Sequence, residues 1–251
     1  MPLAGEHARA VIKRLVALGG GHSVVQRAVA RELSALAPSE ANEFLHELQR
    51  LARTGWLPAV TVLPSVVRAL EQEPELAGLA DVARRVAALE ERPDVEMLFT
   101  QGAPQREYDA DAAARADAKL FTMPLGYLKQ QARLTRNPDE LARLAVASNP
   151  EVVREVLKNT RLTEAIVVRI AARRPARPEP LTEIWRSARW SGRPAVRRAL
   201  VCNPYLPPEV AAKIVPLLSR AELQEIVGDN SLHVAVRRQA EVLLSVAGTV
   251  D

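Results

Sequence analysis

The feature that most constrains this chain is an internal repeat in its second half. Residues 149–170 and 193–214 carry similar residue types in nearly the same order. The matched pairs are Pro150 with Pro194, Arg154 with Arg197, Leu157 with Leu200, Asn159 with Asn203, Leu162 with Leu206, Ile166 with Val210 and Ile170 with Ile214, with one residue inserted near Cys202. Self-similarity at this period is typical of stacked helical units, none of which buries its apolar face alone. We therefore expect stacked helices in this half.

Corners between the expected helices carry asparagine followed by proline. Three such pairs occur, at Asn137-Pro138, Asn149-Pro150 and Asn203-Pro204. Asparagine tolerates the left-handed conformation that ends a helix, and proline suits the first turn of the next one. No run of alternating β-branched residues between turn residues competes with this pattern. The sequence therefore predicts an all-α fold.

Helical periodicity also fills residues 1–91, where apolar residues recur on one face of five expected helices. Ser23 and Gln26 have the spacing of a capping box. Ser39 is expected to cap the third helix and Gly55 to end it. These short, closely connected helices predict an N-terminal helical bundle or degenerate helical hairpins.

The domain prediction follows from these changes in pattern. Residues 1–91 form the expected N-terminal helical domain. Residues 92–123 have mixed composition, and we expect a linker there with one exposed helix near 108–120. Residues 124–251 form the expected helical repeat domain.

Residues 137–244 resemble the variant leucine-rich and HEAT-like helical repeat proteins of bacteria. The shared order is Asn-Pro, then Arg, Leu, Asn and Leu, with Thr or Pro next. The matching residues are Asn149, Pro150, Arg154, Leu157, Asn159, Leu162 and Thr163, then Pro194, Arg197, Leu200, Asn203, Leu206 and Pro207, and more weakly Asn230, Ser231, Val236, Arg237 and Ala240. The resemblance implies an α-solenoid and says little about function, because such repeats serve as binding surfaces of many kinds. The proline-rich segment 171–192 departs from the pattern.

Charge is distributed unevenly along the chain. Residues 1–124 hold 14 Lys and Arg against 17 Asp and Glu, whereas residues 125–251 hold 20 against 13. Residues 161–198 alone hold 10 basic side chains against 3 acidic ones. A local basic stripe favours an acidic partner, which is an acidic protein, a nucleic acid or an anionic membrane surface.

The candidate partner-binding residues lie where the repeat is interrupted. Arginine binds carboxylate or phosphate through two parallel hydrogen bonds, and an exposed tryptophan anchors a partner or stacks on a base. The candidates are Arg173, Arg174, Arg177, Trp185, Arg186, Arg189, Trp190, Arg193, Arg197 and Arg198. The alternative interpretation is solvated arginines and two tryptophans packed in the core.

Arginine also recurs within the repeat, at Arg154, Arg197 and Arg237. This recurrence predicts either a basic ladder for binding or a structural role, in which each arginine pairs with carbonyls or a carboxylate of the adjacent unit. The structural role accounts better for periodic recurrence.

Catalytic and metal-binding patterns are not found. The single cysteine, Cys202, excludes an internal disulfide, and the four histidines show no metal-ligand spacing. No phosphate-binding glycine loop is present, so we expect no cofactor, no metal and no catalytic residue. The sequence shows neither a signal-peptide pattern nor an apolar run long enough for a membrane span, which favours the cytoplasm.

Two functions fit these observations. The first is a non-catalytic scaffold that binds a protein partner, with an acidic surface, through the basic repeat surface. The alternative is a nucleic-acid-binding protein, including a HEAT-like DNA glycosylase, which would use a concave basic face with Trp, Arg and one carboxylate. Asp229 and Glu183 are the carboxylates considered for that role.

Overall fold

The structure is a computed structural model that describes residues 3–19, 22–109, 123–145 and 149–246. Every regular element within these ranges is helical, as predicted, and no strand occurs among them. The chain divides into two compact units by its internal contacts. Unit 1 comprises residues 1–101, 212–230 and 234–251, and unit 2 comprises residues 102–211 and 231–233.

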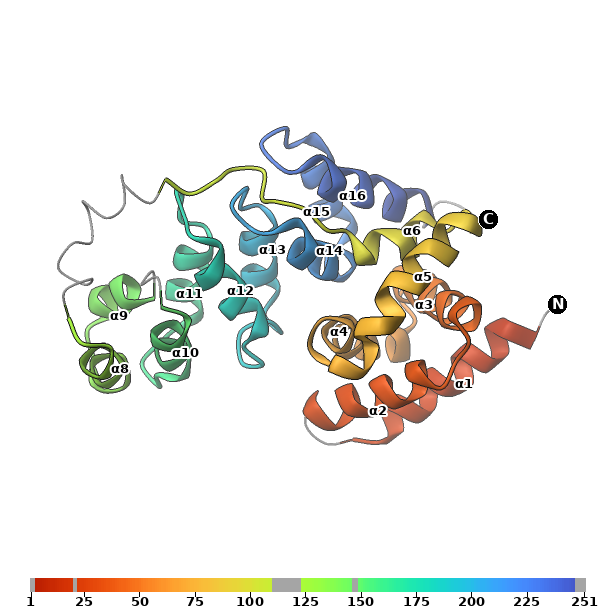
Figure 1. Cartoon of the computed structure of the whole chain (residues 1–251), viewed down its shortest axis with the longest axis horizontal. Coiled ribbons are helices and arrows are strands. Elements are labelled where there is room, and N and C mark those ends of the chain that lie inside the picture. Colours follow the sequence, from red (N-terminus) through yellow and green to blue (C-terminus); the bar gives the residue numbers. More distant parts are fainter. Residues whose placement is uncertain (1–2, 20–21, 110–122, 146–148, 247–251) are drawn as a thin grey trace. The chain divides into compact units, whose positions relative to one another are not determined.

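Unit 2 is built from short helices in two rows. The helices are α8 (Leu125–Leu134), α9 (Pro138–Leu144), α10 (Pro150–Lys158), α11 (Glu164–Ala171), α12 (Pro178–Arg186) and α13 (Pro194–Val201), and α14 (Pro208–Ile214) begins in this unit. Helix α10 packs between α8 and α12 in one row, and α11 packs between α9 and α13 in the other (Figure 1). Consecutive helices thus alternate between rows, so each row buries the apolar face of the other.

The structure corrects the register of the sequence repeat. Helices α10 and α13 both have proline in their first turn, at Pro150 and Pro194. The spacing from this proline to the following asparagine is the same in both copies, at Asn159 and Asn203. No residue is inserted between the copies, and Arg154 is therefore equivalent to Arg198, not to Arg197.

Equivalent asparagines of the repeat have equivalent contacts. The Asn159 amide donates to the carbonyl oxygens of Ala132 and Thr135 at 2.8 and 3.1 Å, at the end of α8. The Asn203 amide donates to those of Ala171 and Arg173 at 2.7 and 3.0 Å, at the end of α11. Both side chains are buried, and each supplies donors to carbonyls left unpaired at a helix end. The repeated asparagine therefore joins the ends of α10 and α13 to the ends of earlier helices.

Two of the three asparagines that precede proline have a different role from the one predicted. Asn137 and Asn149 are N-cap residues in extended conformation, and each side chain accepts a hydrogen bond from the second following amide at 2.9 Å. Glu91 is the one described non-glycine residue with positive φ, so none of the corner asparagines is left-handed. These residues begin helices rather than end them.

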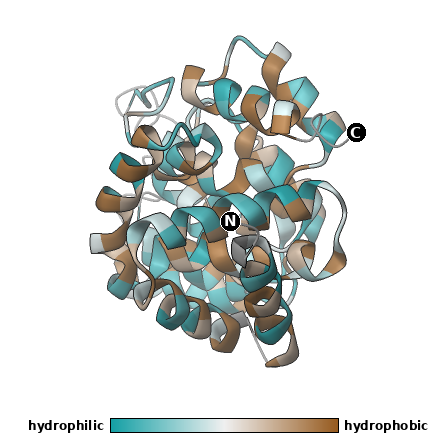
Figure 2. Ribbon diagram, turned by 90° about the vertical axis from the view of Figure 1, so that its right-hand side faces the viewer, coloured by the Kyte–Doolittle hydropathy of each residue, from teal (hydrophilic) through white to brown (hydrophobic). Residues whose placement is uncertain are grey.

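Unit 1 is a bundle around two central helices. Helix α3 packs against α1, α4 and α5, and α4 packs against α1, α2 and α3. The helices are α1 (Leu3–Ala17), α2 (His22–Ser34), α3 (Pro38–Arg53), α4 (Leu57–Gln72), η1 (Pro74–Leu76), α5 (Ala77–Leu89), α6 (Pro93–Glu96), η2 (Met97–Phe99), η3 (Val215–Leu217), α15 (Arg220–Gly228) and α16 (Val234–Val246). Hydrophilic and hydrophobic positions alternate along individual helices, as expected for helices buried on one face (Figure 2).

The five helices expected in residues 1–91 are present, but their caps differ. Ser23 lies inside α2, and Ala37 rather than Ser39 is the N-cap of α3. Gly55 follows α3 as predicted, with a φ of 79°. The Trp56 amide donates to the Leu51 carbonyl at 3.0 Å, which closes the end of the helix around this left-handed glycine.

Residues 92–123 are not a linker over their whole length. Val95, Leu98 and Phe99 are buried in unit 1, whereas the Arg106 amide donates to Pro204 of unit 2 at 3.1 Å. The expected exposed helix near 108–120 lies almost entirely outside the described residues.

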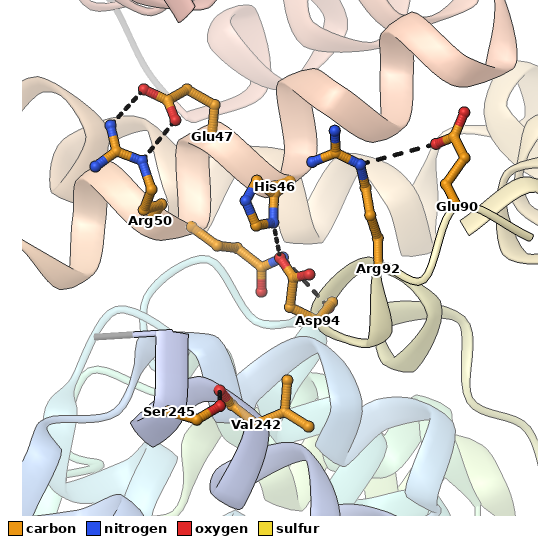
Figure 3. A network of polar contacts seen from close by, with 9 residues as sticks. His46, Glu47, Arg50, Glu90, Arg92, Asp94, Val242 and Ser245 are labelled. Carbon is orange, nitrogen blue, oxygen red and sulfur yellow. Dashed lines mark hydrogen bonds and ion pairs between the residues drawn. The ribbon is translucent and has the colours of Figure 1, made fainter. Parts of the chain in front are cut away.

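Asp94 joins α6 to the centre of unit 1. Its buried carboxylate lies 2.9 Å from Nδ1 of His46 and accepts a hydrogen bond from Gln49 Nε2 at 3.3 Å (Figure 3). Both partners come from α3, so a segment predicted as the start of the linker is part of the N-terminal core.

The predicted N-terminal domain ends at residue 91, whereas unit 1 also includes helices from the C-terminal part of the chain. The Arg53 guanidinium donates to the carbonyls of Leu218, at 2.7 Å, and Pro216. Lys213 donates to the carbonyl of Leu98. Helix α16 packs against α6, α15 and η3. Two segments far apart in the sequence therefore share one core, a pairing that no local pattern encodes.

Candidate functional site

A cleft between α10 and the end of α12 is lined by several charged side chains of unit 2. Its volume is about 580 Å³. The lining residues are Arg154, Leu157, Lys158, Glu183, Arg186, Ser187, Ala188 and Arg189. Four cationic side chains thus surround a single carboxylate. We refer to this site as the basic cleft.

Helix periodicity places these charges at the cleft. In α10, Val152, Val153, Val156 and Leu157 are buried, which leaves Arg154 and Lys158 one turn apart on the other side. Lys158 and Arg186 each lie in the last turn of their helix, where the carbonyl ends favour positive charge.

Glu183 is the buried anion of the basic cleft, with a side chain only 5% exposed. Its two oxygens accept hydrogen bonds from Arg154 Nε and Nη2 at 2.7 and 3.0 Å. Arg186 Nη1 is 3.4 Å from the same carboxylate. The hydrogen bonds to Glu183 raise the pKa of Arg154 above its ordinary value. Both guanidinium groups are therefore held beside the carboxylate, while about half of each side chain stays exposed.

Lys158 belongs to a second charged group on α10. Its ammonium is 3.3 Å from Glu155, which also accepts a hydrogen bond from Arg133 Nε of α8 at 2.6 Å. The hydrogen bond from Arg133, assisted by Lys158, lowers the pKa of Glu155. The Lys158 side chain is 73% exposed, so most of its charge faces the solvent at the mouth of the cleft.

Arg189 is held in place by the repeat itself. Its guanidinium donates to the carbonyls of Asn159 and Leu162 at 3.0 and 3.2 Å, and lies 4.3 Å from the centre of the Trp190 ring. These contacts fix Arg189 over the corner between α10 and α11. It contributes charge to the cleft, but its hydrogen bonds serve the fold.

Both tryptophans of the predicted binding surface are buried. Trp185 is 0% exposed and Trp190 is 3% exposed. The Trp190 ring nitrogen donates to the Leu157 carbonyl at 2.9 Å. The expectation that these rings are exposed anchors is wrong, because the row of helices closes over them, and the packed-core interpretation applies instead.

The other predicted arginines do not converge on the basic cleft. Arg173 and Arg198 are exposed. Arg174 donates to the Cys202 carbonyl, and Arg177 lies 4.7 Å from the centre of the Tyr108 ring. Arg193 is 3.8 Å from Glu164, and Arg197 Nε donates to the Ser191 carbonyl at 2.7 Å. Only Arg186 and Arg189 of the ten candidates line the cleft.

The recurrent arginines have structural contacts, but of these contacts the one between Arg154 and a carboxylate of another helix is the kind that the second interpretation predicts, whereas those of Arg197 and Arg237 are local. Arg154 pairs with Glu183 of another helix, and Arg197 donates to a carbonyl of its own corner. Arg237 donates to Asn230 Oδ1 at 2.8 Å within unit 1. Their partners are of three kinds, so the three side chains do not share one contact.

Sequence reasoning missed Lys158 as a site residue and treated Arg154 only as part of a ladder. The local signal was present, because Arg154 and Lys158 lie one turn apart on the polar face of a helix with periodic apolar residues. What the sequence does not contain is the approach of α12, which brings Glu183 and Arg186 to that face.

Neither a metal site nor a membrane-spanning helix is found in the described residues. No group of three His, Cys, Asp or Glu side chains able to hold a metal ion occurs among them. No helix within the described ranges is long and apolar enough to cross a bilayer. No protein-family model, no curated protein and no solved structure matches this chain.

Proposed function

We propose that this protein is a non-catalytic scaffold and that unit 2 binds an acidic segment of a protein partner in the basic cleft. The observation that carries the proposal is the excess of positive charge around one neutralised carboxylate. Arg154, Lys158 and Arg186 have side chains that are 51%, 73% and 50% exposed, while Glu183 is 5% exposed. A ligand therefore meets the cations rather than the anion.

The chemistry of the cleft suits carboxylates. The Arg154 guanidinium is already ordered by its two hydrogen bonds to Glu183 and its side chain is 51% exposed, so it needs little further ordering to bind a second carboxylate. Leu157 and Ala188 add apolar lining beside the charges. An extended or helical segment with clustered Asp and Glu is the partner that these features favour.

The fold proposed for this scaffold is an α-solenoid of HEAT-like or variant leucine-rich repeats. The two rows of helices in unit 2 and the matching roles of Asn159 and Asn203 support it. The proposal places the protein in the cytoplasm, on the sequence evidence alone.

Nucleic-acid binding is the alternative, and base excision is its enzymatic form. Base excision and base stacking need groups that reach a base, whereas Trp185 and Trp190 are buried and both oxygens of Glu183 accept hydrogen bonds from Arg154. These contacts favour the protein scaffold. Phosphate binding through the same arginines is distinguished by experiment, because it weakens steeply with salt.

The test is a binding titration with a fluorescent, glutamate-rich peptide, followed by anisotropy. A double variant, Lys158→Gln with Arg186→Gln, is expected to weaken binding about tenfold, because two cations facing the ligand are lost. The control is Arg161→Gln with Arg173→Gln, which removes the same charge from exposed positions that do not line the cleft. Equal losses in both variants would contradict a defined cleft.

A duplex DNA of unrelated sequence is titrated in parallel at about 50 mM and 200 mM salt. The proposal predicts that the higher salt concentration weakens binding of the peptide less than binding of the DNA. DNA binding that is tighter than peptide binding, and lost in the Lys158 and Arg186 variant, would replace the proposed partner with nucleic acid.

A further inference from the structure

Unit 1 contains a groove of opposite character, with a volume of about 530 Å³. It lies among α1, α2 and α3, so three helices supply its walls. Its apolar floor is formed by Val11, Leu33, Leu36 and Phe44. Three of these are buried and Leu36 is half-buried, which makes the floor a recess rather than a flat patch. We refer to this site as the acidic groove.

Carboxylates surround the apolar floor, and they differ in how far they are neutralised. Glu43 makes no hydrogen bond or ion pair with the described residues. Glu40 accepts the Ala37 amide through one oxygen, at 3.0 Å, which leaves its other oxygen available. Glu32 is paired with Arg14 at 2.6 Å on the surface. Negative charge therefore predominates at the rim, on the side formed by α3.

We propose that the acidic groove binds a basic amphipathic helix of a partner protein. A helix presents apolar side chains along one face at spacings of three and four residues, which fits a recess walled by helices. Lysines or arginines on the flanks of that helix would meet Glu40 and Glu43. The volume is within the range of small ligand pockets, and it accommodates apolar anchors rather than a whole helix, which would lie across the mouth.

This inference is independent of the basic cleft, because it concerns unit 1 and a partner of opposite charge. An acidic segment would be repelled from the groove by its carboxylates, and a basic helix would be repelled from the cleft by its arginines. Two chemically distinct sites on one chain are what a scaffold needs to hold two different partners.

The probe is a synthetic fluorescent helix of leucine and lysine, with leucines on one face, titrated against the whole protein. Glu43→Lys is expected to weaken binding about tenfold, because an attraction is replaced by a repulsion. Lysine at this position is one turn from Glu47, so the helix itself is not strained. The matched control, Glu75→Lys, makes the same charge change at an exposed position outside the groove and is expected to stay within about twofold of the unchanged protein.

The apolar part of the site is tested separately. A scrambled peptide of the same composition cannot form an apolar face and is expected to bind about tenfold more weakly. Leu36→Ser is expected to weaken binding of the ordered helix but not of the scrambled one, with circular dichroism as the check on folding. Equal binding of both peptides, or equal losses in Glu43→Lys and Glu75→Lys, would overturn the proposal.

Self-association is the remaining outcome, and it is measured by sedimentation of the protein without peptide. The proposal predicts no dimer that depends on Glu43. A dimer that dissociates on Glu43→Lys would assign the groove to a second copy of the chain and overturn the partner helix.

Discussion

Two buried asparagine side chains accept and donate hydrogen bonds at helix ends, where they satisfy backbone carbonyls that water would otherwise satisfy. Asn159 and Asn203 are 5% and 2% exposed and donate to the carbonyl ends of α8 and α11. Their own oxygens accept the amides of Arg161 and Tyr205 at 2.8 and 3.0 Å. Alanine at either position would leave buried groups of both kinds without a partner.

We predict that Asn159→Ala and Asn203→Ala each lower the free energy of unfolding by about 1–3 kcal/mol, because buried polar groups lose their hydrogen bonds. Urea unfolding followed by tryptophan fluorescence measures the loss, since Trp185 and Trp190 are both buried in unit 2. The control is Gln130→Ala, at an exposed position of unit 2, with an expected change below about 0.5 kcal/mol. Equal effects at all three positions would contradict the structural role of the repeated asparagine.

At the scale of helices, ion pairs link neighbours in a row. Glu155 of α10 joins α8 through Arg133, and this hydrogen bond lowers the pKa of Glu155. A carboxylate with a lowered pKa in the folded state contributes stability above its unfolded pKa of about 4.3. That contribution is lost as the pH falls through the folded pKa, because protonation removes the interaction with Arg133.

We predict that Glu155→Gln lowers the stability of unit 2 by about 0.5–1 kcal/mol at neutral pH, a small effect because Arg133 is largely exposed. The difference from the unchanged protein should narrow towards zero as the pH is lowered to about 3. Urea titrations at several pH values measure it, with the exposed Glu179→Gln as a control that should show no such narrowing. A difference that stays constant with pH would mean that Glu155 acts through packing rather than charge.

Helices were predictable here because their signals are local. Apolar residues at helical spacing and proline in the first turn, as at Pro150 and Pro194, mark α10 and α13 without any tertiary information. The register of the repeat was misjudged because Arg197 and Arg198 are adjacent, and a match to either one looks equally good in the sequence.

The candidate site was less predictable than the helices. Which arginines converge depends on the packing of α12 against α10, and burial of Trp185 and Trp190 depends on helices from both rows. A side chain that is exposed on an isolated helix becomes core once a neighbour covers it. Tryptophan in an amphipathic helix therefore indicates burial as readily as binding.

At the scale of the whole molecule, the two ends of the chain share a core. Unit 1 contains residues 1–101 together with α15 and α16, and α16 packs against α6. Arg53 is buried where these two segments of unit 1 pack together. Desolvation lowers its pKa to about 10, and its guanidinium donates to the carbonyls of Pro216 and Leu218. The predicted boundary near residue 92 missed this because contacts between distant segments leave no local pattern.

We predict that a chain ending at Ala211 loses stability in unit 1 and keeps the fold of unit 2. Ending the chain there removes η3, α15 and α16, and with them the carbonyl partners of Arg53 and the cover of α6. Hydrogen exchange should therefore become faster in α3 and α6, while the fluorescence of Trp185 and Trp190 stays that of buried indoles. A chain ending at Val246 is the control, and unchanged exchange in α3 and α6 would contradict the shared core.

The central claim is that the basic cleft is where unit 2 binds an acidic partner. Hydrogen exchange of the whole protein with and without a saturating glutamate-rich peptide tests it most directly, because the result is read along the chain. The proposal predicts slower exchange in the last turn of α10 around Lys158 and in residues 186–189. Protection absent from both segments, or spread evenly over the exposed arginines at 173, 193 and 198, would contradict it.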